Sequence, residues 1–209
     1  YLHALDIENS LGSNLVAARE LADAVDLLLS ATGAPKVDLV THSMGSVAGR
    51  LYVKKNGGDD KVRDFASLAG ANHGAFMSGC PQYCPDAVCW YCGAGGYEMS
   101  TTYACAGEAR NDVQFILNGC LTDEGRTVEA DETPFGVEDG GGIAYLSLYS
   151  DYDGTIFPNE SPCLNMQRRG DCTDPVNVQV RGVYHLSFPN DEEVLELTVG
   201  HLRARNRSR

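Results

Sequence analysis

The chain has 209 residues, and 29 acidic against 16 basic side chains give it a formal net charge of −13. This length fits one domain with a sizeable core, and the negative charge argues against nucleic acid or an anionic membrane as the main partner. No apolar run reaches the roughly 18 residues that a membrane-spanning helix needs. We therefore predict a globular monomer without a transmembrane segment.

The first part of the chain alternates apolar strands with amphipathic helices. Ser13 or Asn14 can cap a helix that stops at Gly33. Such alternation predicts an α/β fold, with a mostly parallel sheet and helices on both faces. Predicted strands cover residues 2–7, 36–41 and 65–69, and the next predicted helix covers residues 44–55.

The periodicity disappears over residues 75–142, where cysteines, glycines and prolines dominate apart from one predicted helix at 111–118. Long irregular segments inside a domain are usually functional loops or are held by cross-links. We predict a single domain over residues 1–209 that contains 75–142 as a cysteine-rich insertion, a candidate lid. The sheet resumes at 143–149 and 176–183, and Asn190 is predicted to cap a final helix.

The chain has eight cysteines. An even number without a thioredoxin-like context favours secretion with four disulfides, and Cys163 with Cys172 is the local pair that we predict. A second interpretation is a tetrathiolate zinc site. Its ligands would be Cys80, Cys84, Cys89 and Cys92. In the disulfide interpretation no metal and no cofactor is required.

Residues 37–45, Val-Asp-Leu-Val-Thr-His-Ser-Met-Gly, carry the most specific signal. A buried-strand pattern runs into Ser43 and then into a helix, which is how a nucleophile elbow presents a serine hydroxyl on a strained backbone. The tight turn requires small neighbours, and Gly45 meets this requirement. Thr41 stands where the G-x-S-x-G pattern has its first glycine, so the match is imperfect.

With the elbow in view, the chain resembles the compact secreted bacterial lipases of the α/β-hydrolase superfamily, the class 2 or actinobacterial type of triacylglycerol lipase. In these lipases the elbow reads A-H-S-M-G or similar, which residues 42–45 match. The segments 1–6, 31–38, 68–72, 148–150 and 177–185 resemble successive parts of such a lipase. Residues 75–140 do not, so the likeness covers roughly two thirds of the chain.

A serine nucleophile needs a histidine base, which a carboxylate in turn orients. In this fold the order along the chain is serine, acid, histidine, and His185 is the histidine that fits it. Asp151 and Asp153 both follow the strand at 143–149 and are both candidates for the acid. The resemblance places the catalytic aspartate at Asp153, with Asp151 as the alternative.

The oxyanion of a tetrahedral intermediate needs backbone donors, and the N–H of Met44 at the start of the elbow helix is one candidate. A second donor cannot be assigned from the sequence. In the resembling hydrolases that donor follows a strand lying between the equivalents of 2–7 and 36–41. We therefore expect a strand and oxyanion loop of roughly 30 to 50 residues to precede this chain, unless residues 2–7 pair directly with 36–41.

Together these patterns predict a secreted serine esterase or lipase that acts on carboxylic, acylglycerol-like esters. The substrate would be a dissolved ester or a lipid at a lipid–water interface. A cutinase-like or polyester hydrolase and an acyltransferase share the same three residues and remain alternatives within the class. A non-catalytic binding module on a hydrolase scaffold is the alternative outside it.

Overall fold

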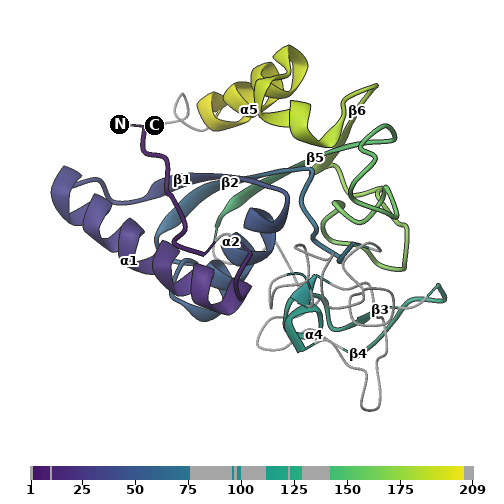
Figure 1. The fold of residues 1–209 in the computed structure, drawn as a ribbon, viewed down its shortest axis with the longest axis horizontal. Helices are drawn as coiled ribbons and strands as arrows, with labels where there is room; N and C mark the ends of the chain where they lie inside the picture. The colour runs from purple at the N-terminus through teal and green to yellow at the C-terminus, as the bar shows by residue number, and fades with distance from the viewer. Residues whose placement is uncertain are drawn as a thin grey trace, which may run out of the picture.

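The computed structural model describes residues 2–9, 11–75, 96, 98–99, 112–121, 123–128 and 142–204. Figure 1 shows the arrangement of its elements. In chain order they are α1 (Asn14–Thr32), β1 (Val37–His42), α2 (Met44–Lys55), β2 (Val62–Leu68), α4 (Asp112–Asn118), β3 (Cys120–Leu121), β4 (Arg126–Val128), β5 (Ala144–Ser150), β6 (Asn177–Val180), the 3-10 helix η3 (His185–Asn190) and α5 (Glu192–Ala204).

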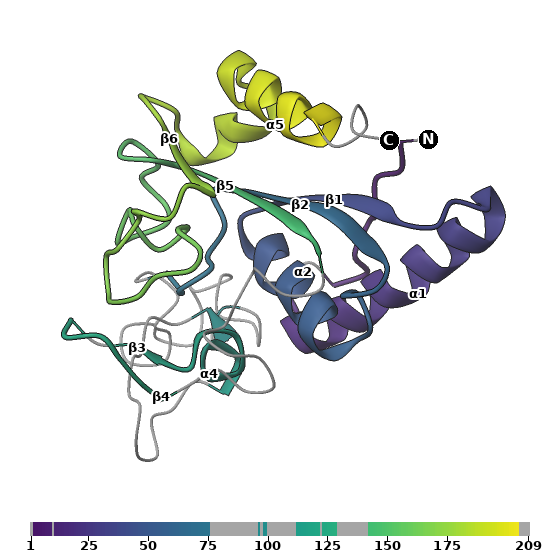
Figure 2. The same ribbon diagram turned by 180° about the vertical axis from the view of Figure 1, so that it is seen from behind.

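Four strands form a parallel sheet in the order β1-β2-β5-β6. Helices α1 and α2 cover one face of it and α5 covers the other, as the two opposite views show (Figures 1 and 2). The predicted α/β class, with a mostly parallel sheet between helices, is thereby confirmed. Strands β3 and β4 form a separate antiparallel pair that the sequence did not predict.

The core lies on both faces of the sheet because side chains alternate along each strand. Phe65 of β2 and Tyr145 of β5 belong to the cluster beneath α1 and α2. Their neighbours Ala66 and Leu146 belong to the cluster that includes Val194 of α5. Burial on both faces explains why these strands read as nearly continuous apolar runs.

The caps of α1 agree with the prediction from sequence. The Ser13 side chain accepts a hydrogen bond from the N–H of Leu15 at 3.2 Å. Gly33 ends the helix with φ of 67°, and its N–H donates to the carbonyl of Leu29 at 2.9 Å. A left-handed residue at this position favours glycine because no Cβ opposes the turn.

The strand predicted over residues 2–7 is wrong. These residues form no strand in the structure, and residues 2–6 are exposed. A strand forms where backbone partners are available, and the strand paired with β1 in the described part of the chain is β2. The alternative that residues 2–7 pair directly with 36–41 is therefore also wrong. Instead, a groove of about 490 Å³ separates this segment from β1.

Smaller corrections concern element ends. Strand β2 starts at Val62, three residues before the predicted start. Strand β6 stops at Val180, before the predicted end at residue 183, and Gly182 follows it with φ of 70°. The cap of α5 is Asp191 and not Asn190, because the Asp191 carboxylate accepts the N–H of Val194 at 3.1 Å.

Most of the predicted insertion, residues 75–142, lies outside the described residues. The proposed zinc ligands lie in this part of the chain, so the zinc site stays a hypothesis; they are Cys80, Cys84, Cys89 and Cys92. The single domain also stays a prediction. The predicted helix at 111–118 is present as α4. Within the described ranges, no helix is both long and apolar enough to cross a membrane.

Candidate active site

Strand β1 passes into α2 through a strained turn at Ser43. The backbone angles of Ser43 are φ 56° and ψ −128°, a conformation that costs a non-glycine residue on the order of 1–3 kcal/mol. Its N–H donates to the Leu68 carbonyl at 3.0 Å, and its own carbonyl accepts the N–H of Ala71 at 3.3 Å. These bonds to the end of β2 hold the serine above the sheet, as a nucleophile elbow requires.

The glycine that the tight packing requires is not Gly45. A Cβ built at Gly45 would have no neighbour within 4 Å, so crowding does not explain this residue. A Cβ at Gly49, one turn later, would lie 3.0 Å from the side chains of Phe65 and Thr41. The close approach of α2 to the sheet therefore depends on Gly49. Thr41, buried beneath it, replaces the first glycine of the usual pattern without loss of the turn.

The structure brings Ser43, His185 and Asp153 together from three separate parts of the chain. His185 Nε2 lies 2.8 Å from Ser43 Oγ, and His185 Nδ1 lies 2.9 Å from Asp153 Oδ2. His185 is 5% exposed and Asp153 is 3% exposed. A proton on Nδ1 is donated to the carboxylate, which leaves Nε2 free to accept the serine hydroxyl proton.

The Asp153 carboxylate is held by the backbone as well as by His185. Its Oδ1 accepts the N–H groups of Thr155 at 2.9 Å and Ile156 at 2.7 Å. The N–H of His185 donates to the Asp153 carbonyl at 3.0 Å. The alternative acid, Asp151, is exposed. Of the two aspartates, the structure places Asp153 next to His185.

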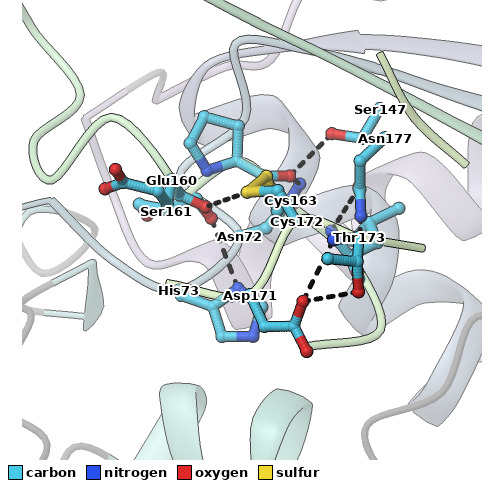
Figure 3. Close-up of a disulfide and its surroundings, with 12 residues drawn as sticks. Asn72, His73, Ser147, Glu160, Ser161, Cys163, Asp171, Cys172, Thr173 and Asn177 are labelled. Atoms are coloured by element: carbon cyan, nitrogen blue, oxygen red, sulfur yellow. Dashed lines mark hydrogen bonds between the residues drawn. A yellow bond between two sulfur atoms is a disulfide. The ribbon is translucent and has the colours of Figure 1, made fainter. Parts of the chain in front are cut away.

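The loop that carries Asp153 is anchored to two neighbouring segments (Figure 3). The carbonyl of Pro162 accepts one hydrogen bond from Asn72 Nδ2 and another from Ser147 Oγ, both at 2.6 Å. Next to it, Cys163 and Cys172 form the disulfide that the sequence predicted. A disulfide restricts the unfolded chain, and the buried hydrogen bonds fix the position of the loop relative to the sheet.

Three further histidines are not placed to act as the base for Ser43. The ring of His73 hydrogen-bonds to the carbonyl of Ser161 at 3.3 Å, and the ring of His201 in α5 to that of Ala144 at 3.3 Å. His3 lies in the exposed segment 2–7. His185 is the histidine that the structure places in contact with both Ser43 and Asp153.

His42 is the site residue that sequence reasoning underestimated. From the sequence, a histidine at the start of a helix is more often a packing neighbour of the site, but His42 Nε2 donates to the carbonyl of His185 at 3.0 Å. The two rings also stack at a centroid distance of 4.7 Å. Burial lowers the pKa of His42, and the nearby His185 lowers this pKa further. Its position next to Ser43 was the signal that could have identified it.

Met44 begins α2, where backbone N–H groups have no partner within the helix. Its N–H is therefore available to a developing negative charge beside Ser43. A cavity of about 250 Å³ adjoins Ser43 and Met44, and small residues, including Gly12, Gly45 and Ala48, line part of it. Among the residues with described positions, no group of three or more His, Cys, Asp or Glu side chains could hold a metal ion.

Two comparisons with known proteins found similarities to lipases. Residues 8–105 match the model of the family described as lipase (class 2), which is a little under half of the chain. The chain is also similar in structure to lipase B of Aspergillus fumigatus, with 16% sequence identity and a TM-score of 0.49. That match covers 82% of this chain but 34% of the fungal lipase, so the chain spans about a third of its length.

The family match includes the segment from α1 through the elbow and β2. The parallel sheet places the carboxyl ends of β1, β5 and β6 at one edge, which is where α/β proteins have their binding sites. Over residues 8–105 the chain is therefore similar to the lipases of class 2, and its parallel sheet between helices is an α/β arrangement.

Proposed function

We propose that the chain is a secreted serine esterase or lipase that hydrolyses carboxylic esters of the acylglycerol type through an acyl-enzyme on Ser43. The observation that carries the proposal is the continuous contact from Ser43 Oγ through the His185 ring to the Asp153 carboxylate. The strained backbone at Ser43 supports the same role, since such strain is typical of a functional position.

The reaction follows from the proton positions. Ser43 Oγ attacks the ester carbonyl while His185 Nε2 accepts the hydroxyl proton, and His185 then donates this proton to the departing alcohol. Asp153 keeps the other imidazole proton on Nδ1 and stabilises the imidazolium. The N–H of Met44 stabilises the oxyanion. Water, deprotonated by His185, resolves the acyl-enzyme and regenerates the serine.

Localisation outside the cell is part of the proposal. The disulfide between Cys163 and Cys172 supports it, because such bonds persist in oxidising compartments. Cys120 is also disulfide-bonded. Intact mass measured with and without reductant would check this: eight paired cysteines reduce the mass by about 8 Da. Eight thiols that react at once with an alkylating agent in the purified native protein would contradict it.

The proposed nucleophile can be tested without knowledge of the natural substrate. An organophosphonate should label Ser43 alone, and Ser43→Ala should lose both the label and the hydrolysis of p-nitrophenyl butyrate. Ser187→Ala is the matched control, because Ser187 is exposed two residues from His185. That variant should keep both. Labelling at another serine, or full turnover by Ser43→Ala, would reject the proposal.

The alternatives within the class differ in the acyl acceptor and the acyl donor. Polyester films and triacylglycerol emulsions offered side by side separate a cutinase-like enzyme from a lipase. An added alcohol, with ester formation followed in place of acid release, identifies an acyltransferase. We expect acid release from acylglycerols to dominate.

A further inference from the structure

His42 faces away from the side of the sheet that α1 and α2 cover. Side chains alternate along β1. Leu39 packs against the cluster on the α1 and α2 side, and Thr41 hydrogen-bonds to Ser46 of α2 at 2.9 Å. The side chain of His42, next along the strand, therefore points to the opposite side. There η3 begins with His185.

Two contacts join His42 to His185. A carbonyl oxygen can only accept, so His42 carries its proton on Nε2 and donates it to the His185 carbonyl at 3.0 Å. The tilted ring stack, with centroids 4.7 Å apart, restrains the imidazole plane of His185 from the same direction. His42 thus contacts both the backbone and the ring of the proposed base.

These contacts complement those made by Asp153. The carboxylate and the carbonyl of Asp153 hold His185 at ring Nδ1 and at the backbone N–H, both from the acid loop. His42 holds His185 from the strand that carries Ser43. The base is therefore connected directly to the nucleophile side as well as to the acid side, and the distance from Nε2 to Ser43 Oγ depends on both.

We propose that His42 is a positioning residue, which holds the backbone carbonyl and ring of His185 so that Nε2 stays in line with Ser43 Oγ. The inference rests on the serine-hydrolase function proposed above. Small displacements between reacting groups reduce rates strongly, so a second anchor on the base has a direct catalytic consequence.

The electrostatic environment fits this role. During the reaction His185 becomes positively charged, and a second positive charge on His42 would oppose that step. Burial, followed by the influence of His185, lowers the pKa of His42 below its ordinary value, which favours the neutral form of this ring. The charge of Asp153 raises the pKa of His42 and so acts in the opposite direction. Two other titratable side chains, those of His3 and Asp38, line the groove beside His42.

Two substitutions separate the hydrogen bond from the ring contact. His42→Gln keeps an uncharged N–H donor at about the reach of Nε2, whereas His42→Phe keeps a flat ring without a donor. If the free energy of one neutral hydrogen bond is lost from the transition state, the rate falls by roughly three- to ten-fold. We expect His42→Phe to lower kcat by about that factor with KM unchanged, and to slow phosphonate labelling of Ser43 equally. His42→Gln, which keeps the donor and loses the ring contact, should be faster than His42→Phe in both rates.

The outcomes are distinct. The positioning role would be overturned if His42→Phe were as fast as the wild type, or if His42→Gln were as slow as His42→Phe. In either case, labelling of Ser43 in the wild type would still uphold the proposed function. Equal midpoints of thermal unfolding for the two variants would exclude a difference in stability as the cause of the rate difference. If the wild type itself shows no labelling at Ser43, the serine-hydrolase function fails, and this inference fails with it.

Discussion

The two sides of Ser43 are built differently. On the acid side, residues 151–164 and His185 are held by a disulfide and by paired buried groups, as in the two bonds to the Pro162 carbonyl. On the opposite side, residues 2–6 are exposed and leave a groove of about 490 Å³ beside β1. The acid side of Ser43 is thus held by several cross-links, whereas on the opposite side no described strand pairs with the outer edge of β1.

The largest effect should come from the two aspartates, which test whether the acid side is as specific as its geometry indicates. Asp153→Asn should lower kcat by a factor on the order of 10³ to 10⁴, because the amide favours the wrong tautomer of His185. Asp151→Asn is the matched control and should change kcat little. Steady-state kinetics on p-nitrophenyl butyrate measures both, and a reversed ranking would transfer the acid to Asp151.

Hydrogen exchange compares the two sides directly. Amides of Leu146 and Leu148 in β5 lie within a parallel ladder and should exchange slowly, since they open only with large parts of the fold. Amides of residues 2–7, outside any helix or strand, should exchange at least about 100-fold faster. Exchange followed by mass spectrometry on the intact protein gives these rates. Equal protection in the two segments would remove the contrast.

Asn72 tests how much the anchor of the acid loop stabilises the protein. Its Nδ2 donates to Pro162 and to Ser67, and the side chain is fully buried. Asn72→Ala removes both of these buried hydrogen bonds, so we expect a loss of about 1–3 kcal/mol in the free energy of unfolding. Asn9→Ala, the same change at an exposed position on the other side of Ser43, should stay within about 0.5 kcal/mol. Urea unfolding measures both, and similar losses would contradict the comparison.

The smallest effect concerns the pH dependence of stability. The pKa of His42 is lowered from 6.5 in the folded state, by burial first and by His185 second. The unfolded chain therefore binds more protons just below pH 6.5, and the stability contributed by neutral His42 is complete above pH 6.5 and declines as the pH falls below it. His42→Gln should remove this component. Urea unfolding between pH 5 and 8 should show a shallower decline for the variant, whereas parallel curves would contradict the assignment.

Much of the site was predictable because its signals are local. The strand, elbow and helix around Ser43 follow from apolar periodicity and from a turn within nine residues, and chain order then selects His185. The cap at Ser13 and the stop at Gly33 are local in the same sense. Predictions failed where pairing decides the structure: residues 2–7 have an apolar pattern, but no strand in the described part of the chain pairs with them.

The sequence by itself determined the fold class and was sufficient to propose Ser43 and His185 as the reacting pair, since each of these inferences depends on short-range pattern and order. The tertiary structure decided which aspartate meets His185, because Asp151 and Asp153 follow the same strand and differ only in the direction that the turn gives them. It also decided the contact of His42 with His185. These two residues are 143 positions apart, and only the packing of η3 against the end of β1 brings them together.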